Sequence, residues 1–359
     1  MQTRFKNRKA RGWVVTGAVG VVAFAAGCGN LNESGPRAVV YAPSGELTVF
    51  LDGEVRFFDA DTHALGSMST QAQVGGGWVP FAPRFASSSD GTTVAIGANQ
   101  TVQIYSVEKR KNVASIIVDV DPGERYPIVG ITLSPHGDLV AVSVASIGMT
   151  EAPSLTIWRV ADQTQAVAVA APADRPDWSW RDGLAFSLDA TTLYGIGSYT
   201  ADTGLPKSYV SAWNAQTGVL VWETEISDGS MDGALTLSVD GSIVATAGSS
   251  IHLWRASDGS QLPLQAKPTT GFNTVALSPN GQDFVLTHWS NDAPDPQVIG
   301  PDGVVIWGAP VGGSSSGCQS GVFSPDGTRV AAACDLELKI WNAQTGTLIR
   351  SLKVAGPVY

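Results

Sequence analysis

Several short motifs in the chain contain residue types that could do chemistry. Residues 313–317, with the sequence GSSSG, match the G-x-S-x-G pattern in which a serine acts as a nucleophile. That pattern requires a sharp turn from a strand into a helix, whereas here it lies among small and polar residues. A flexible loop is the better interpretation, and we assign no catalytic residue to it.

Metal and phosphate chemistry is not indicated either. The four histidines have no metal-ligand spacing, and His63 and His136 fall in predicted turns. Residues 119–124 resemble a calcium loop but lack its length and its pattern of ligands. The chain has no phosphate-binding loop. We therefore predict no cofactor, no metal and no catalytic residue.

The chain is built from copies of one unit, and the last copy, residues 321–350, is the clearest. Residues 324–327 (SPDG) form a turn with proline in its second position and a closing glycine. A short apolar strand follows at 330–333, and residues 338–341 alternate apolar and polar side chains as a half-buried strand does. A second turn at 342–346 leads into a fourth strand.

Two features of this unit recur seven times in register. The turn ends at Gly45, Gly91, Gly137, Ala190, Gly241, Gly281 and Gly327, which gives a mean spacing of 47 residues over the 282 residues between the first and the last. An aromatic residue follows each turn, at the predicted end of the third strand: Phe58, Tyr105, Trp158, Trp213, Trp254, Trp307 and Trp341. We expect these rings to pack between neighbouring blades rather than to hold a ligand.

These repeats resemble the WD-repeat β-propeller superfamily over residues 37–354. The resemblance implies an all-β fold, a seven-bladed β-propeller of four-stranded antiparallel blades, with a short tail at 355–359. The chain lacks the Gly-His pair and the Asp after Trp of eukaryotic members, and is more similar to bacterial periplasmic relatives. An all-β sandwich is the alternative, because no sustained helical pattern follows the N-terminal segment.

The N-terminus is predicted to be an export and anchoring signal. Five basic residues and no acidic one lie in residues 1–27, and an uncharged run at 12–26 is short for a spanning helix. The run ends at Gly27-Cys28, which resembles a bacterial lipobox and implies that Cys28 becomes a diacylated N-terminus, although Ala25 stands where the family usually has Leu. An ordinary signal peptide is the alternative. Residues 28–36 would then be a membrane tether, and Gly29 resembles lipoproteins sorted to an outer membrane.

The charge balance excludes one class of partner. The chain has a formal net charge of −10, and residues 28–359 hold 17 basic against 32 acidic residues. Such a surface repels nucleic acid, so we predict no nucleic-acid binding.

The copies differ in their loops, and these differences suggest a partner-binding face. Three units carry extra residues at about 146–153, 198–207 and 289–300, all between the second and third strands. In an antiparallel blade these loops emerge on the same face as the long connections between blades, and we expect that face to lie towards the membrane. Acidic and aromatic loop residues there suit a basic or amphipathic peptide, or a sugar; simple solvation of polar loops is the alternative. The residues chosen for this face are Tyr126, Asp174, Asp177, Trp178, Trp180, Asp182, Tyr199, Trp289 and Asp292.

Two cysteines are predicted to meet across the last blade. If Ser324 pairs with Thr328 around the turn, Cys318 and Cys334 have the same index sum and could face each other. An exported protein meets an oxidising compartment in which a disulfide can form. Two free thiols are the alternative.

The most consistent function is that of a non-catalytic, monomeric interaction module held at the cell envelope by its lipid. The runner-up within that class is a protein similar to the propeller lipoprotein of the outer-membrane barrel-assembly machine, which engages extended segments of its partners. The rival class is an enzyme or ligand-binding propeller, of quinoprotein-like or glycan-acting type. Residues 214–218 followed by Trp222 resemble the quinoprotein repeat, but the same residues recur at 342–346 without the tryptophan, so blade structure also explains them.

Overall fold

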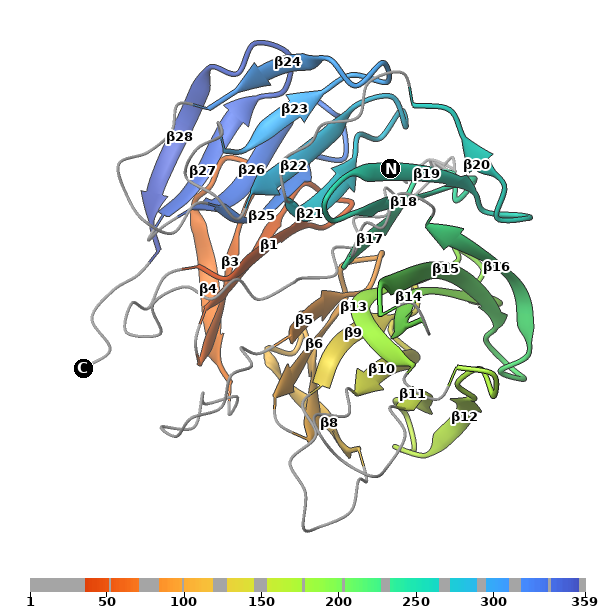
Figure 1. The fold of residues 1–359 in the computed structure, drawn as a ribbon. Helices are drawn as coiled ribbons and strands as arrows, with labels where there is room; N and C mark the ends of the chain where they lie inside the picture. Colours follow the sequence, from red (N-terminus) through yellow and green to blue (C-terminus); the bar gives the residue numbers. More distant parts are fainter. Residues whose placement is uncertain are drawn as a thin grey trace, which may run out of the picture.

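The computed structural model describes residues 36–51, 53–70, 84–98, 100–118, 128–144, 154–175, 178–201, 204–226, 233–264, 272–288, 295–309, 318–334 and 337–354. Cys28, the predicted signal segment and the predicted tail at 355–359 lie outside these ranges. Within them, the regular structure is β-strand, arranged as seven four-stranded antiparallel sheets around a common axis (Figure 1). This confirms the predicted seven-bladed propeller.

Each blade uses four consecutive strands, ordered from the axis outwards. Blades one to four comprise β1 (Ala38–Tyr41), β2 (Leu47–Leu51), β3 (Glu54–Phe58), β4 (Ala64–Ser69); β5 (Arg84–Ser87), β6 (Thr93–Ala98), β7 (Thr101–Ser106), β8 (Lys111–Ile117); β9 (Ile128–Leu133), β10 (Leu139–Val144), β11 (Ser154–Arg159), β12 (Gln165–Val169); and β13 (Ser179–Phe186), β14 (Thr192–Thr200), β15 (Pro206–Asn214), β16 (Leu220–Ile226). Blades five to seven comprise β17 (Ala234–Leu237), β18 (Ile243–Ala247), β19 (Ile251–Arg255), β20 (Gln261–Leu262); β21 (Phe272–Leu277), β22 (Phe284–His288), β23 (Gln297–Ile299), β24 (Val305–Gly308); and β25 (Cys318–Phe323), β26 (Arg329–Cys334), β27 (Glu337–Asn342), β28 (Leu348–Lys353).

The turn between the first and second strands is built by short polar side chains. In blade seven, Ser324 Oγ donates a hydrogen bond to Asp326 Oδ1 at 2.6 Å and accepts one from the Arg329 N–H at 2.9 Å. Asp326 Oδ1 also accepts the Thr328 N–H at 3.0 Å. Serine and aspartate repeat this bond in blades two, four and five, and Asn280 replaces the aspartate in blade six. Local side-chain bonding therefore accounts for the repeated sequence.

The residue that closes this turn has a left-handed backbone. Six copies use glycine with φ between +68° and +86°, and in blade four Ala190 takes φ +57° despite its Cβ atom. The left-handed region costs a residue with a Cβ about 1–2 kcal/mol, so blade four has a strained turn.

In each blade, the turn between the first and second strands and the turn between the third and fourth strands lie at one end of the propeller. The strand ends that lead to the third strand and to the next blade lie at the opposite end. We call these ends the tight-turn face and the long-loop face. Every turn between the first and second strands and between the third and fourth strands is described, so the tight-turn face is complete in the structure. Two of the predicted insertions, at about 146–153 and 289–300, fall wholly or largely outside the described ranges.

The third predicted insertion, at 198–207, is partly strand rather than loop. β14 and β15 are nine residues each and pair from Thr192 with Asn214 up to Thr200 with Pro206. The extra residues lengthen this hairpin, which ends in a turn where the Ala201 N–H bonds the Leu205 carbonyl oxygen at 3.0 Å. Blade four therefore reaches further towards the long-loop face than a loop count indicates.

The prediction that Trp307 ends the third strand of blade six is wrong. Trp307 lies in β24, the fourth strand, and the residue opposite Phe284 in β23 is Ile299. Trp254 takes the equivalent place opposite Val244 in blade five. The other six aromatic residues do lie in third strands, all buried except the half-buried Trp158.

The ring closes between blade one and blade seven, each of which supplies all four of its own strands (Figure 1). Apolar residues of both blades share one buried cluster, which includes Val39, Phe50, Ala331 and Ile340. Polar contacts add to this packing. The Val39 N–H donates to Ser320 Oγ at 3.0 Å, and the guanidinium groups of blade seven reach backbone oxygens of blade one.

The predicted disulfide is confirmed. Cys318 and Cys334 pair across β25 and β26 with their Cα atoms 4.0 Å apart, and their sulfur atoms are bonded. The register predicted from Ser324 and Thr328 is off by one residue, because Phe323 lies opposite Val330 and Ser320 opposite Ala333. A bulge at Gln319 shifts the pairing by one residue and so brings Cys318 opposite Cys334. No helix in the described ranges is long and apolar enough to cross a membrane.

Candidate interaction surface

The predicted partner-binding residues fall into two groups. Five of the nine lie in the described part of the chain, and the structure places them on or near blade four: Asp174, Trp178, Trp180, Asp182 and Tyr199. The other four lie outside it: Tyr126, Asp177, Trp289 and Asp292.

Trp178 and Trp180 are core residues, so the prediction that they contact a partner is corrected. Their side chains are 2% and 1% exposed, and their rings meet edge to face at 5.5 Å between centroids. Trp180 also packs against Trp213, 5.3 Å away. Gly197 lies so close beneath Trp178 that an added Cβ atom would be 2.0 Å from the indole. The two tryptophans fill the space between blades three and four.

Asp182 is also buried, on the innermost strand of blade four. The pairing of β13 with β14 is interrupted between Trp180 and Leu184, and this bulge carries Asp182. Its carboxylate lies 3.7 Å from the guanidinium of Arg84 in blade two, and both side chains are about one-tenth exposed. Burial raises the pKa of Asp182, and the positive charge of Arg84 only partly opposes this. Asp182 therefore pairs blades internally and is not presented to a partner.

Gly130 in the intervening blade makes that pair sterically possible. A Cβ atom on Gly130 would lie 2.7 Å from the backbone oxygen of Asp182. An inner strand with a side chain at this place would displace Asp182 from its position beside Arg84.

Arg175 organises the part of this region that remains accessible. Its guanidinium stacks 4.1 Å above the ring centroid of Tyr209 and lies 5.6 Å from that of Tyr199. Arg175 Nη1 is 2.7 Å from Glu223 Oε1. Burial opposes the charge on Arg175, but the contact with Glu223 outweighs it and raises the pKa of the guanidinium. A planar cation held between rings and a carboxylate has little freedom to move.

A second ion pair, between Lys207 and Glu225, lies on β15 and β16, the strands that also carry Tyr209 and Glu223. Lys207 Nζ is 3.0 Å from Glu225 Oε1, and the Tyr209 hydroxyl donates to Glu225 Oε2 at 3.1 Å. The hydrogen bond from Lys207 lowers the pKa of Glu225, so the carboxylate is ionised at neutral pH. We call the set Arg175, Tyr199, Lys207, Tyr209, Glu223 and Glu225 the rim cluster.

Only Tyr199 of the rim cluster was predicted from the sequence. Tyr209, Ser211 and Trp213 lie two residues apart on β15 and so share one face of that strand, as Glu223 and Glu225 do on β16. This period of two could have indicated that the outer strands of blade four carry a polar face. Arg175 had no such signal, because it lies in an irregular connection. Asp174, next to it, is 78% exposed in its side chain and remains available to a partner.

A hollow of about 600 Å³ lies between the outer strands of blades four and five, apart from the rim cluster. Its walls include Tyr194, Trp222, Ile243 and Leu262, and its charged residue is Arg255. Arg255 already faces Asp258 at 3.7 Å, and the Trp222 indole donates to the Ala256 carbonyl oxygen at 3.0 Å. These polar groups are thus engaged within the blades. Across the described ranges, no three His, Cys, Asp or Glu side chains come together as metal ligands would.

Comparison with known proteins agrees on the fold. No family model matches the sequence, and no curated protein matches it. The chain is similar in structure to Kuenenia stuttgartiensis hydrazine synthase, with a TM-score of 0.66 at 14% identity over 89% of this chain and 98% of that one. It is also similar to the Cps50 (Swd1) β-propeller domain of Myceliophteria thermophila, with a TM-score of 0.63 at 14% identity over 91% and 99%.

The chain is a seven-bladed propeller that resembles a WD40 domain. At this level of identity the likeness concerns the fold alone, and propellers of this shape serve both enzymes and scaffolds. The function must therefore be argued from this chain's own surface.

Proposed function

We propose that this chain is a non-catalytic interaction module of the cell envelope that binds a protein partner on its long-loop face, next to the rim cluster. The observation that supports this most is the combination of rigid and exposed polar groups on blade four. Arg175 is only 16% exposed and braced by Tyr209, whereas Asp174, Lys207 and Glu225 present 78%, 39% and 41% of their side chains. Preorganised side chains lose little entropy when a partner binds.

The partner that suits this surface is a basic or amphipathic protein segment. Three carboxylates, Asp174, Glu223 and Glu225, stand against the two cations Arg175 and Lys207. Tyr199 and Tyr209 stack with their ring centroids 6.0 Å apart and offer aromatic area. Arginine and aromatic contacts are typical of protein interfaces.

Reversal of the most exposed charge tests this proposal. In cells, a photo-crosslinking residue in place of Tyr199 should capture one protein, and Asp174→Lys should weaken its co-purification by about fivefold, which is the effect of losing one rim charge pair. Lys353→Glu, a charge reversal on the outer strand of blade seven, is the matched control and should change nothing. Equal recovery of the partner with Asp174→Lys would contradict the proposal.

The proposed attachment to a membrane rests on the sequence at Cys28. A diacylated cysteine gives stable anchoring, because two acyl chains bury enough hydrocarbon where one does not. Labelled fatty acid should be incorporated into the protein and lost in Cys28→Ser, which should also move from the membrane fraction to the soluble fraction. Membrane association that survives Cys28→Ser would exclude the lipid as the anchor.

A further inference from the structure

The tight-turn face has a feature that repeats around the whole ring. The seven turns between first and second strands hold one acidic residue each and no Lys or Arg. These acidic residues, which we call the acid ring, are Glu46, Asp90, Asp138, Asp189, Asp240, Asp283 and Asp326. Five are exposed, and Asp90 and Asp283 are half-buried. The outer turns of the same face add six more carboxylates against Lys109 and Arg110.

The carboxylates of the acid ring are oriented by their own turns. Asp189 Oδ1 accepts bonds from the Ser187 hydroxyl at 2.6 Å and from the Thr191 N–H at 3.1 Å. Asp240 accepts the same pair from Ser238 and Ser242 at 2.7 and 2.9 Å. These bonds lower the pKa of both groups and keep them anionic at neutral pH. The negative charge is therefore held in place rather than spread over mobile side chains.

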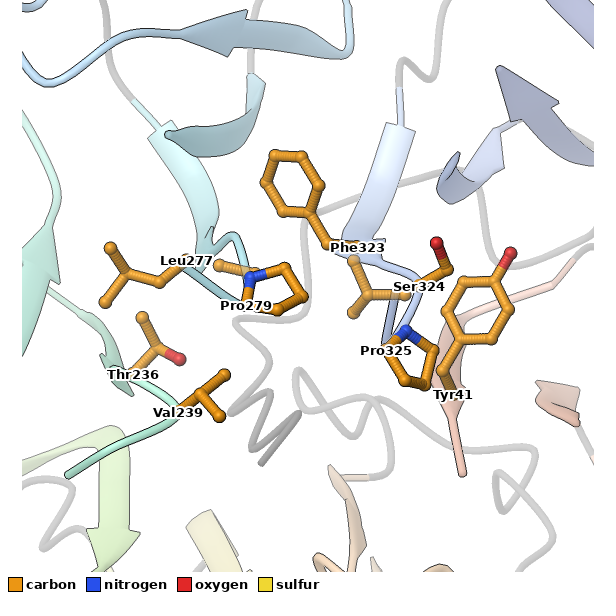
Figure 2. A pocket seen from close by; sticks show the side chains of 10 residues that line it. Tyr41, Thr236, Val239, Leu277, Pro279, Phe323, Ser324 and Pro325 are labelled. Carbon is orange, nitrogen blue, oxygen red and sulfur yellow. The ribbon is translucent and has the colours of Figure 1, made fainter. Parts of the chain in front are cut away.

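The centre of this face is apolar. A recess is lined by residues of blades five, six, seven and one, with Val239, Pro279, Pro325 and Tyr41 at its edge (Figure 2). Leu277 and Phe323 form its walls, on the strand ends that precede the turns (Figure 2). Each of Val239, Pro279 and Pro325 immediately precedes the third residue of a turn, which is acidic in blades five and seven and Asn280 in blade six. In blades five and seven, apolar lining residues of the recess are therefore sequence neighbours of the acid ring.

Two properties of the recess limit what can bind. Its volume is about 20 Å³, room for roughly one water molecule, so it admits the tip of a side chain and not a small-molecule ligand. The Tyr41 hydroxyl is buried and has no hydrogen-bond partner in the described part of the chain. Because this oxygen atom is covered, a ligand at the recess meets the apolar side chains that line it.

Arg329 is a basic residue that directly follows one of these turns, and its side chain bonds to blade one. Arg329, the first residue of β26, donates from Nη1 to the Ala60 carbonyl oxygen at 2.7 Å. The acid ring therefore keeps a net negative charge that an oppositely charged partner could neutralise.

We propose that the tight-turn face is a second docking surface, which takes a basic segment of another protein with one apolar side chain inserted at the axis. Charge complementarity selects this occupant: lysine and arginine residues meet the acid ring while an aliphatic tip contacts Val239, Pro279 and Pro325. This surface lies at the opposite end of the propeller from the rim cluster. One molecule could then hold two proteins at once, which extends the proposed function.

Defined peptides test both parts of this surface. The probes are fluorescent Lys-Arg-Lys-Leu-Lys-Arg-Lys, the same peptide with Gly in place of Leu, and Glu-Glu-Glu-Leu-Glu-Glu-Glu, each titrated with the full folded chain by anisotropy at low salt. We expect the basic leucine peptide to bind, the glycine peptide to bind about fivefold more weakly and the acidic peptide not to bind, because loss of an aliphatic side chain removes about 1 kcal/mol or more of contact energy.

Matched variants separate the acid ring from general surface charge. The triple variant Asp189→Asn, Asp240→Asn and Asp326→Asn removes three charges but keeps the turns, since blade six already uses Asn280 in this role. The triple variant should bind the leucine peptide about tenfold more weakly than the parent protein does, because Coulomb attraction is lost. The control removes three charges from outer turns, by Glu108→Gln, Asp162→Asn and Asp258→Asn, and should weaken it about twofold.

A further variant tests the apolar centre. Val239→Ser is compatible with the turn, because blade two has Ser89 at the same position. It should weaken the leucine peptide about threefold and leave the glycine peptide unchanged. Equal effects of the two triple variants, equal binding of the leucine and glycine peptides, or no binding at low salt would each overturn the proposal. A dimer in sedimentation that Val239→Ser dissociates would assign the surface to a second copy instead.

Discussion

The indole of Trp307 in blade six donates a hydrogen bond to the carbonyl oxygen of Ala343 in blade seven, 2.7 Å away. Trp222 makes the same contact from blade four to Ala256 of blade five at 3.0 Å. Both rings cover the glycine of the next outer turn, where an added Cβ atom would lie 2.8 Å from Trp307 at Gly346 and 2.4 Å from Trp222 at Gly259. Two interfaces between blades therefore use the same tryptophan–glycine contact.

Removal of the Trp307 indole should separate its two contributions to stability. We expect Trp307→Phe, which keeps a ring but loses the donor, to lower the free energy of unfolding by about 1 kcal/mol. Trp307→Ala should lower it by about 3–5 kcal/mol, because it also leaves a cavity between the blades. Urea unfolding followed by tryptophan fluorescence measures both. If Trp307→Ala is as stable as the parent, the contact does not hold the blades together.

Ala190 offers a stabilising change. A glycine at this position would remove the left-handed strain and so stabilise the folded chain by about 1–2 kcal/mol. It would also raise the conformational entropy of the unfolded chain, which lowers the free energy of unfolding by about 0.4–1 kcal/mol. Ala190→Gly should therefore raise the free energy of unfolding by about 0.5–1 kcal/mol. The reverse change Gly241→Ala is the control and should destabilise the protein, because Gly241 has φ +70° and its added Cβ atom would press on Leu188 at 3.2 Å.

The disulfide in blade seven should contribute strongly to stability. Cys318 and Cys334 are 16 residues apart, and closing a loop of that size stabilises a folded chain by about 3 kcal/mol. A thermal scan with reductant should lower the melting temperature of the parent protein. The double variant Cys318→Ala and Cys334→Ala should melt at that lower temperature and ignore the reductant; a parent protein insensitive to reductant would contradict this.

The seam between blades one and seven should open first when its polar contacts are removed. Arg350 Nη1 donates to the Asp61 carbonyl oxygen at 2.8 Å and also bonds the Thr62 hydroxyl, and Arg329 reaches Ala60. We expect Arg329→Ala with Arg350→Ala to speed hydrogen exchange in β1 and β25 and to leave blade four unchanged. Arg255→Ala, on another interface, is the control and should not affect the seam. Uniformly faster exchange would argue against a local seam.

Stability should fall at acidic pH because of the turn aspartates. Hydrogen bonds from Ser187 and Thr191 lower the pKa of Asp189, and bonds from Ser238 and Ser242 lower that of Asp240. In the unfolded chain these carboxyls titrate near their ordinary pKa of about 3.9. Their contribution is therefore complete above about pH 4 and is lost as the pH falls through their lower folded pKa values.

The triple asparagine variant of the acid ring provides the measurement. It keeps the acceptor oxygens but cannot titrate, so its free energy of unfolding should depend less steeply on pH between about pH 2 and pH 4 than that of the parent. Equal slopes would show that other carboxyls dominate acid unfolding.

The repeating part of the fold could be predicted because its causes are local. Ser324, Asp326 and Gly327 bond within one turn, so the sequence of that turn carries its structure, and seven copies in register predict seven blades. The predicted pairing of Cys318 with Cys334 is confirmed, but counting outwards from the turn does not by itself give it, because the bulge at Gln319 shifts the register by one residue.

The candidate site could be predicted only in part, because its residues meet across blades. Trp178 and Trp180 lie in a loop-like sequence, but the neighbouring blade supplies the surface that buries them. Arg84 reaches Asp182 only because Gly130 of the blade between them has no side chain. Trp307 was assigned to the wrong strand because β23 is only three residues long and carries Ile299 where other blades have an aromatic residue.

The sequence alone thus determined the blade count and the turn chemistry, which depend on neighbours within a few residues of a turn. It also predicted the disulfide, although the bulge at Gln319 that brings the two cysteines together was not part of that prediction. The tertiary structure decided which aromatic rings are core, how Arg175 is braced, how the ring closes, and that residues of blades five, six, seven and one line one recess on the tight-turn face. Those features depend on contacts between segments that are distant along the chain, such as Val39 and Ser320, which are 281 residues apart, and a linear pattern does not encode which side chains meet there.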